Sequence, residues 1–441
     1  MRSGQQWRVA IAGAALMGLV VACGDDDDNR TANIIVTTLA DTSGPGPCTL
    51  RDAINLANGD PVSGSRCNNA VPGADAIVFE QGLTGTIALT DTLPAITGEV
   101  TIAGPASGGP ITVSGEHEVG VLEVASGAML VVENLTIANG DTASSEGAGI
   151  MNAGDLRVES CSFSGNRTSG AGGAIGNIGD EVQVENCVFT NNGAGSVGGA
   201  ITSRSGVVFV MNSTFSMNVS GDGGGGAIHI AGGGSLTVNS STFAANNSRG
   251  TGGAVETNGS ATITNSTFSG NIAMGSGGAL SARNGANVQI NASTFAGNSA
   301  TQFPGGALFV HSGGNISIKS SILARATDVF TPNCATSPSG PIVNATYNIS
   351  TDASCGFGTS TGAGGQTIGD NVNPMLDPEG LQDNGGPTET IALLAGSPAI
   401  GAIPDGACTD QHGNDILFDQ RGEPRPDEAP CSIGAYEFNT D

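Results

Sequence analysis

The chain has 441 residues and a formal net charge of −26, because 40 acidic residues outnumber 14 basic ones. A surface this acidic repels DNA, RNA and anionic lipid headgroups, so we expect no nucleic-acid partner. The 38% apolar content is sufficient for a folded core and argues against a disordered chain, although 71 residues are Gly.

Residues 1–22 have the features of a bacterial signal peptide: two arginines, then an apolar stretch too short to span a bilayer. The stretch ends in Val20-Val21-Ala22-Cys23, which resembles a lipobox. The resemblance implies cleavage before Cys23 and lipidation of its thiol; the alternative is an ordinary secretory signal that contains a Cys. Residues 23–32 are acidic and should form a flexible linker. From the signal peptide and the lipobox we expect export and a lipid anchor as the membrane partner, and Gly24 after the Cys favours a location at the outer membrane or cell surface.

Residues 33–96 are expected to cap the N-terminal end. Thr49 can N-cap a short amphipathic helix that ends at Gly59, and Asp52 stands at its third position. The segment resembles the Cys-Ser-Leu-Arg-Glu-x motif found ahead of surface β-helices, with Thr49 and Asp52 as conservative changes.

A repeated phrase runs through the middle of the chain, with a Phe followed three residues later by Asn. Between successive phrases lies Gly-Gly-Ala followed by Ile, Val or Leu, and each unit holds three short β-prone runs. This period is typical of a solenoid, and we predict an all-β, right-handed, single-stranded parallel β-helix with three strands per coil over residues 97–330. The Phe residues that define the period are Phe163, Phe189, Phe215, Phe243, Phe268 and Phe295, spaced 26, 26, 28, 25 and 27 residues apart.

These phrases resemble the polymorphic outer-membrane-protein repeats and the broader right-handed β-helix repeats over residues 130–325. The resemblance implies a cell-surface β-helix but no reaction. Since coils stack about 4.8 Å apart, identical positions should touch. We therefore expect a Phe stack and a ladder of amides from Asn166 to Asn298.

Eight of the nine cysteines fall into neighbouring pairs, which an exported chain would join as disulfides. Cys161 and Cys187 would lie in adjacent coils, either as a disulfide or as an unbonded ladder. No zinc-ligand spacing is present in the sequence, and we expect no metal and no cofactor. The expected pairs are Cys48 with Cys67, Cys161 with Cys187, Cys334 with Cys355, and Cys408 with Cys431.

A strip of polar residues follows the Gly-Gly-Ala turns and is expected to face outward. Glu256 would stand one coil from each of two basic residues, so the strip is a candidate for sugar binding or catalysis. The alternative is an ordinary set of solvent-facing cross-strand pairs. The candidate strip comprises Arg204, His229, Glu256, Asn258, Arg283 and His311.

Residues 331–441 are expected to form a C-terminal cap. The phrases Ser397-Pro398-Ala399-Ile400, Asp419–Pro426 and Ile433–Glu437 resemble the domain called choice-of-anchor Q. Gly401 and Ser432 stand where that pattern often has Asp, which puts any turn bonds of those Asp residues in doubt.

For function, we expect a rigid surface scaffold for adhesion or envelope structure, without catalysis, whose partner could be a glycan or a host-cell surface. The alternative is a polysaccharide-binding or polysaccharide-cleaving β-helix that uses the strip near Glu256. Pectate-lyase-like chemistry needs a cationic base and often a carboxylate cluster that holds Ca²⁺. Lys319 is the sole lysine and the repeats contain few acids, which weakens that alternative.

Overall fold

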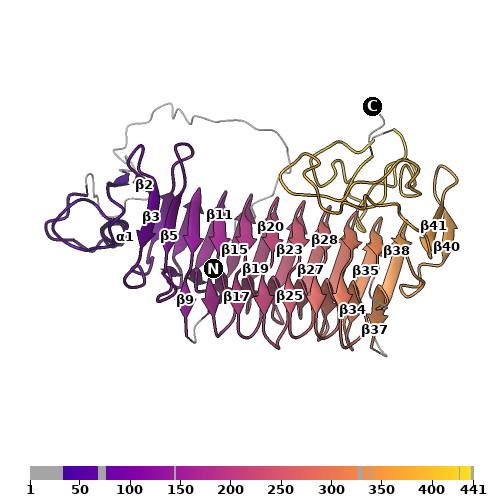
Figure 1. The fold of residues 1–441 in the computed structure, drawn as a ribbon, viewed down its shortest axis with the longest axis horizontal. Coiled ribbons are helices and arrows are strands. Elements are labelled where there is room, and N and C mark those ends of the chain that lie inside the picture. The colour runs from indigo at the N-terminus through magenta and orange to yellow at the C-terminus, as the bar shows by residue number, and fades with distance from the viewer. Residues whose placement is uncertain are drawn as a thin grey trace, which may run out of the picture. The chain divides into compact units, whose positions relative to one another are not determined.

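A computed structural model describes residues 33–67, 76–143, 146–325, 331–337, 340–426 and 428–438. These residues form the predicted right-handed parallel β-helix (Figure 1). The signal peptide, Cys23 and the linker lie outside the described residues. Within the described ranges, no helix has the length and apolar character needed to cross a membrane.

The strands of the described residues form four sheets, numbered here in the order in which one coil visits them. Sheets 1, 2 and 3 correspond to the three predicted runs, and sheet 4 adds a short strand of two residues per coil. Sheet 1 contains β6 (Leu122–Val124), β10 (Ile150–Asn152), β14 (Ile175–Asn177), β18 (Ile201–Ser203), β22 (Ile228–Ile230), β26 (Val255–Thr257), β30 (Leu280–Ala282), β34 (Leu308–Val310) and β37 (Cys334–Thr336).

Sheet 2 holds the strongly alternating strands, and sheet 3 holds the Phe strands. Sheet 2 contains β1 (Ile34–Val36), β2 (Ala76–Phe79), β4 (Glu99–Ala103), β7 (Met129–Glu133), β11 (Asp155–Glu159), β15 (Glu181–Glu185), β19 (Val207–Met211), β23 (Ser235–Asn239), β27 (Ser260–Thr264), β31 (Asn287–Asn291), β35 (Asn315–Lys319) and β38 (Ile342–Thr346). Sheet 3 contains β3 (Gly85–Ala88), β5 (Ile111–Ser114), β8 (Leu135–Ala138), β12 (Ser162–Ser164), β16 (Val188–Thr190), β20 (Thr214–Ser216), β24 (Thr242–Ala244), β28 (Thr267–Ser269), β32 (Thr294–Ala296), β36 (Ile322–Ala324), β39 (Ile349–Ser350), β41 (Thr367–Asp370) and β40 (Thr359–Thr361).

Sheet 4 follows the Asn turn and precedes the Gly pair. The named strands pair in parallel, except that β40 and β41 pair antiparallel. The ladders extend beyond the expected solenoid bounds of 97 and 330, because β1 pairs with β2 and β39 pairs with β41. Sheet 4 contains β9 (Asp141–Thr142), β13 (Arg167–Thr168), β17 (Gly193–Ala194), β21 (Val219–Ser220), β25 (Asn247–Ser248), β29 (Ile272–Ala273) and β33 (Ser299–Ala300).

The interior contains the two predicted ladders. Ring centroids of Phe163 and Phe189 lie 4.6 Å apart with an angle of 1° between the ring planes, and the stack continues to Phe295. In the amide ladder, the backbone N–H and the side-chain amide of Asn166 both donate to Oδ1 of Asn192, at 3.1 and 3.0 Å. The Asn192 side chain in turn donates to the Phe163 carbonyl. These bonds satisfy polar groups that would otherwise be buried without partners.

Cys161 and Cys187 are free and buried, so the predicted disulfide between them is wrong. Their sulfurs occupy a ladder that serine forms in the next coils. The backbone N–H of Cys161 donates to Sγ of Cys187 at 3.4 Å, and that of Cys187 donates to Oγ of Ser213 at 3.0 Å. Each thiol thus fills the hydrogen-bonding position that a serine fills in the following coils.

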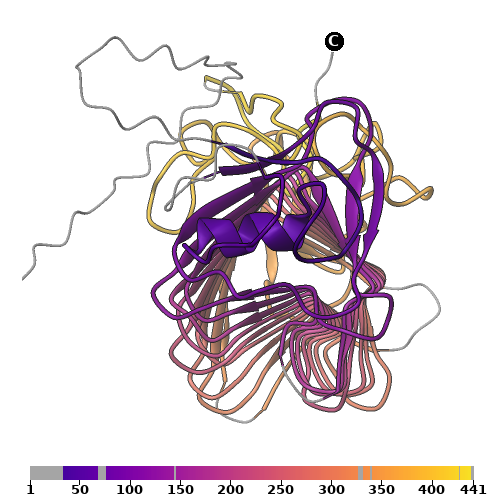
Figure 2. The same ribbon diagram turned by 90° about the vertical axis from the view of Figure 1, so that its left-hand side faces the viewer.

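The N-terminal end is closed by α1 (Leu50–Ala57), which lies across the solenoid in Figure 2. Thr49 accepts the N–H of Asp52 at 3.0 Å, as the N-cap prediction requires. The Cys48–Cys67 disulfide holds this segment. Buried helix residues such as Leu50 and Ile54 join the solenoid core, so α1 covers an end that would otherwise expose apolar side chains.

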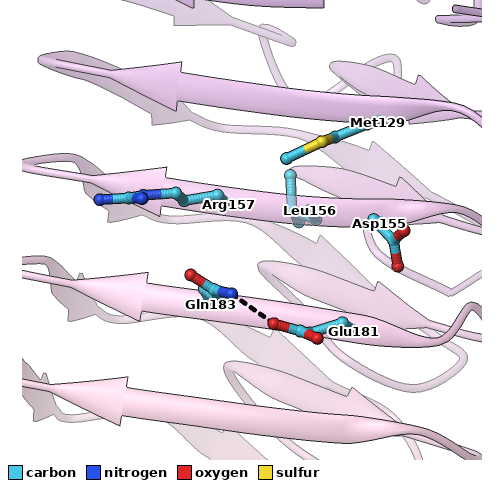
Figure 3. A pocket seen from close by; sticks show the side chains of 6 residues that line it. All are labelled: Met129, Asp155, Leu156, Arg157, Glu181 and Gln183. Atoms are coloured by element: carbon cyan, nitrogen blue, oxygen red, sulfur yellow. Dashed lines mark hydrogen bonds between the residues drawn. The ribbon is translucent and has the colours of Figure 1, made fainter. Parts of the chain in front are cut away.

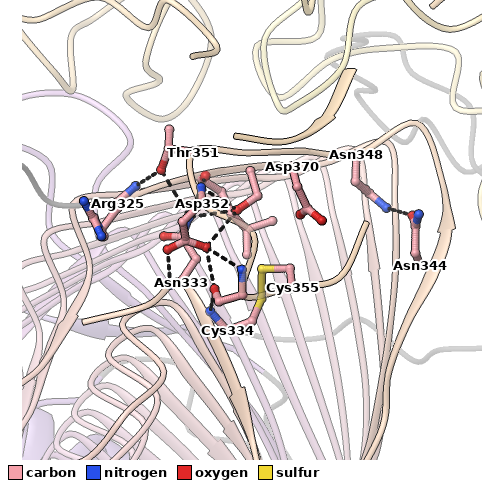
Figure 4. The surroundings of a disulfide bond; sticks show 12 residues. Arg325, Asn333, Cys334, Asn344, Asn348, Thr351, Asp352, Cys355 and Asp370 are labelled. Carbon is pink, nitrogen blue, oxygen red and sulfur yellow. Dashed lines mark hydrogen bonds between the residues drawn. A yellow bond between two sulfur atoms is a disulfide. The ribbon is translucent and has the colours of Figure 1, made fainter. Parts of the chain in front are cut away.

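The C-terminal end is closed by residues 351–358, which the Cys334–Cys355 disulfide attaches to β37 (Figure 4). Phe357 is 8% exposed and completes the solenoid core. Asp352 accepts the backbone N–H groups of Asn333 and Ser354, at 2.9 and 3.0 Å. The short segment therefore closes the end, while most of the predicted C-terminal cap lies elsewhere.

Residues 376–438 pack along the side of the solenoid, on the outer face of sheet 3 (Figure 1, in yellow). Gln420 accepts the Thr267 hydroxyl at 2.6 Å and donates to Thr242 at 2.8 Å. The backbone N–H of Ala435 donates to Thr294 at 3.0 Å. The predicted Cys408–Cys431 disulfide is present within this segment.

This segment contains two turns with the sequence Asp-Gln-x-Gly, at residues 410–413 and 419–422. In the first, Oδ1 of the Asp accepts the N–H groups two and four residues later at 2.8 and 2.9 Å, and the second turn repeats these bonds. Each turn points its Gln at the solenoid: Gln411 donates to the carbonyls of Ile290 and Ser317. The segment therefore docks through two equivalent turns, which were not predicted from the sequence.

Candidate functional site

The candidate strip belongs to the outer face of sheet 1 and to the turn that follows it. In register along sheet 1, Thr202 of β18 pairs with His229 of β22, and His229 pairs with Glu256 of β26. Each of these residues follows an inward-facing Ile or Val, so its side chain points outward as the alternation predicted.

Pointing outward does not expose these residues. His229 is 8% exposed and Glu256 is 2% exposed, so the expectation of a solvent-facing strip is wrong for both. The Gly-rich segments between sheet 4 and sheet 1 cover this face; the one that contains Gly224 and Gly225, which lies over His229 and Glu256, is called the glycine roof here. A Cβ atom at Gly224 would overlap the Glu256 carboxylate, and one at Gly225 would lie 3.1 Å from Cβ of His229. Only glycine permits so close an approach of the backbone.

Glu256 has three polar neighbours under this roof. Its Oε2 accepts the Thr251 hydroxyl and lies 3.5 Å from Nη1 of Arg283. Its Oε1 lies 3.8 Å from Nε2 of His229, which is too long for a hydrogen bond. On the far side of the imidazole, Nδ1 of His229 lies 3.4 Å from Oγ1 of Thr202.

Burial controls the charge of both central groups. Desolvation lowers the pKa of His229 to about 4, and the cations Arg283 and Arg204 add to that effect. Desolvation raises the pKa of Glu256 to about 7, although Thr251 and Arg283 stabilise its charged form. At neutral pH the imidazole is uncharged, so the His229–Glu256 contact is not an ion pair.

The structure does not bring the other strip residues into this group. Arg204 instead pairs with Glu146, at 2.6 Å from its Nε. Asn258 accepts the amide of Asn284 at 3.0 Å. His311 packs edge-on against Phe309, and burial with the nearby Arg283 lowers its pKa to about 4. Of the predicted strip, only His229 and Arg283 lie within 4 Å of the Glu256 carboxylate in the part of the chain that the structure describes.

This geometry does not favour the alternative function, polysaccharide cleavage near Glu256. Glycoside hydrolysis needs two carboxyl groups that flank an accessible bond, whereas the polar neighbours of Glu256 are a hydroxyl, a guanidinium and an imidazole. The roof also separates Glu256 from solvent. Among the described residues, no group of three or more His, Cys, Asp or Glu side chains could hold a metal ion.

A different feature, not predicted from the sequence, is a shallow depression of about 200 Å³ on the outer face of sheet 2 (Figure 3). It spans β7, β11 and β15. The alternation of charged and apolar residues in these strands was a usable signal, because in-register stacking predicts rows of like residues. Its lining residues are Met129, Asp155, Leu156, Arg157, Glu181 and Gln183.

Comparison with known families agrees with the observed fold. The family described as a right handed beta helix region matches residues 110–243. The Chlamydia polymorphic membrane protein repeat matches residues 265–283. No curated protein and no solved structure matches the chain. The β-helix thus contains one segment that is similar to a polymorphic membrane protein repeat.

Proposed function

We propose that the protein is a lipid-anchored component of the outer membrane or cell surface, and that its β-helix is a rigid scaffold without catalysis, used in adhesion or envelope structure. The observation that carries this proposal is the use of polar groups in the coils. They satisfy one another in internal ladders, and the best candidate acid, Glu256, is 2% exposed beneath the glycine roof. The repeat at residues 265–283 supports the surface location.

The anchor is proposed to be the lipidated thiol of Cys23. Metabolic labelling with a radioactive fatty acid should label the full chain and not the Cys23→Ala variant. The variant should leave the membrane fraction, because a lipid chain is then missing. Cys161→Ser is the matched control, since that buried thiol is not part of the signal. Label that persists in Cys23→Ala would overturn this part of the proposal.

The absence of catalysis is tested with a panel of acidic and neutral polysaccharides. Neither reducing sugars nor unsaturated products should accumulate with the wild-type chain. Turnover that is lost in Glu256→Ala would sink the scaffold proposal and establish the polysaccharide-cleaving alternative. Surface location is tested separately by protease treatment of intact cells. If the proposal is right, the protease should digest the β-helix without lysis of the cells.

A further inference from the structure

The sequence contains six Asn-Gly pairs, and all six lie within the described ranges. Because Gly has no Cβ, its backbone nitrogen is open to react with the side chain of the preceding Asn. The nitrogen attacks the side-chain carbonyl carbon, ammonia leaves, and a five-membered succinimide ring closes. Water then opens the ring to aspartate or isoaspartate. The reaction needs a free Gly nitrogen and an Asn side chain that can turn toward it. The pairs begin at Asn58, Asn139, Asn192, Asn258, Asn284 and Asn384.

In five of the six pairs, the Gly backbone N–H donates a hydrogen bond within the protein. Such a nitrogen can attack only after this bond breaks, which requires local opening of the fold. The acceptors are the Leu56 carbonyl for Gly59 at 3.0 Å, Oδ1 of Asn166 for Gly140 at 2.9 Å, the Asn166 carbonyl for Gly193 at 2.9 Å, Oγ1 of Thr257 for Gly259 at 3.1 Å, and Oδ1 of Asp383 for Gly385 at 3.1 Å. The fold therefore protects these five pairs.

The pair Asn284-Gly285, in the turn between β30 and β31, lacks this protection. Among the described residues, the N–H of Gly285 has no hydrogen-bond partner. The Ala286 N–H donates to the Arg283 carbonyl at 2.8 Å, and the two residues between them have φ of 50° and 88°, as in a type I′ turn. A Cβ atom at Gly285 would meet only the Gly313 carbonyl, at 4.0 Å, so the space around this residue is open.

The Asn284 side chain is also the least restrained of the six. Asn284 is exposed, whereas the other five asparagines are buried or half-buried. Its amide donates one hydrogen bond, to Oδ1 of Asn258 at 3.0 Å, and this exposed bond exchanges easily with water. By contrast, the Asn192 amide is buried and donates to both the Phe163 carbonyl and Asn218. Asn284-Gly285 thus combines a free nitrogen with a side chain that can reach it.

We propose that Asn284 is the site at which the folded protein deamidates spontaneously. The carbon–nitrogen bond of the side-chain amide breaks, and ammonia leaves with the proton of the Gly285 nitrogen. Water supplies the oxygen of the new carboxylate. The product places a negative charge next to Arg283, whose Nη1 lies 3.5 Å from Glu256. The isoaspartate form also lengthens the backbone of the turn by one carbon. This inference is independent of the proposed function.

Peptide mapping by mass spectrometry, after incubation of the full chain in detergent at neutral pH, tests the site. Residue 284 should deamidate at least about tenfold faster than the other five asparagines, because their reaction requires local opening. The chain unfolded in urea is the reference. There the six rates should agree within about threefold, because the hydrogen bonds of the fold are lost. A higher pH should accelerate the reaction, since the attacking nitrogen must lose its proton.

Ion exchange of aged samples gives a second measurement, because deamidation produces a more acidic form of the protein. Asn284→Gln should abolish this form, since the longer side chain must close a less favourable six-membered ring. Asn384→Gln is the matched control and should leave the acidic form unchanged, because the Gly385 nitrogen is already bound.

Three outcomes would overturn the proposal. One is faster deamidation at any of the other five pairs in the folded chain, and another is a folded chain in which no pair deamidates. The third is a lead of residue 284 that persists unchanged in urea, because the local sequence and not the fold would then set the rate.

Discussion

The two halves of the outer face of sheet 3 differ, although their sequences repeat the same phrase. In the earlier coils Val188 is 44% exposed, whereas in the later coils Thr242 and Thr267 are 1% and 0% exposed. Behind both halves the Phe rings stack equally, at 4.6 Å for Phe189 on Phe215 and 4.8 Å for Phe268 on Phe295. The interior is therefore uniform, and the difference comes only from residues 376–438, which cover the later coils.

The cover is held by a buried network. Arg425 donates to Glu437 at 3.0 Å and to the Gly434 carbonyl at 2.7 Å, and it reaches Oδ1 of Asn265 on the solenoid at 3.2 Å. Arg421 pairs with Asp419 and lies over the ring of Tyr436 at 3.7 Å. Ser432, where the related pattern often has Asp, donates to Glu437 at 2.7 Å. The Ser432 hydroxyl thus makes a hydrogen bond to Glu437 at this position, where the related pattern often has an Asp.

The largest expected effect is on this network. Arg425→Ala should lower the free energy of unfolding by about 3–5 kcal/mol, because Glu437 is left as a buried unpaired charge. Urea unfolding measures this loss. The control is Arg157→Ala in an uncovered coil, where the side chain is 41% exposed and the loss should be at most about 1 kcal/mol. Equal losses would show that the cover contributes little to stability.

The second largest expected effect is on the pH dependence of the free energy of unfolding, through His229 and Glu256 beneath the glycine roof. The pKa of His229 is lowered to about 4 from 6.5, so its contribution makes stability rise as pH increases through that window. The pKa of Glu256 is raised to about 7 from 4.5, so its contribution makes stability fall as pH increases through that window. In the wild type the two slopes oppose each other between pH 4.5 and 6.5.

Each single variant should reveal the other slope. His229→Gln should lose stability as pH rises, and Glu256→Gln should gain it, by up to about 1.4 kcal/mol per pH unit. Chemical denaturation at several pH values measures both slopes, and the double variant serves as the flat control. Parallel pH profiles for the two single variants would contradict the burial of these groups.

The third effect tests the uniform interior. Asn192→Ala in an uncovered coil and Asn271→Ala in a covered coil should each cost about 1–3 kcal/mol, because the buried backbone N–H of the preceding coil's Asn loses its acceptor. The two losses should agree closely, as the ladder geometry is the same. A much smaller loss for Asn271→Ala would mean that the cover compensates for interior defects.

The smallest effect concerns single hydroxyls on sheet 3. Thr267→Val should cost about 1 kcal/mol, because Gln420 loses a buried partner. Thr214→Val occupies the same repeat position before the cover begins, and it should change stability by less than about 0.5 kcal/mol. Thermal unfolding of both variants makes the comparison. Equal shifts would mean that the hydroxyl acts within the sheet and not through the cover.

Prediction from sequence succeeded where a residue's neighbours are its own repeats. The Phe stack, the Asn ladder and the Thr49 cap are confirmed because each follows from local spacing. It failed for Glu256, since alternation predicts which way a side chain points but not whether another segment covers it. It also failed for Cys161 and Cys187, where adjacency in the stack was taken for a bond.

The sequence by itself determined the coil, its period and its interior, because in a stack of equivalent coils each position packs on the same position of the next coil. Only the tertiary structure decided which outer faces are covered. Gln420 reaches Thr267 from 153 residues away, and no local pattern encodes such a contact. The roof over Glu256 likewise depends on how closely the glycine backbone approaches sheet 1, which only the folded coils define.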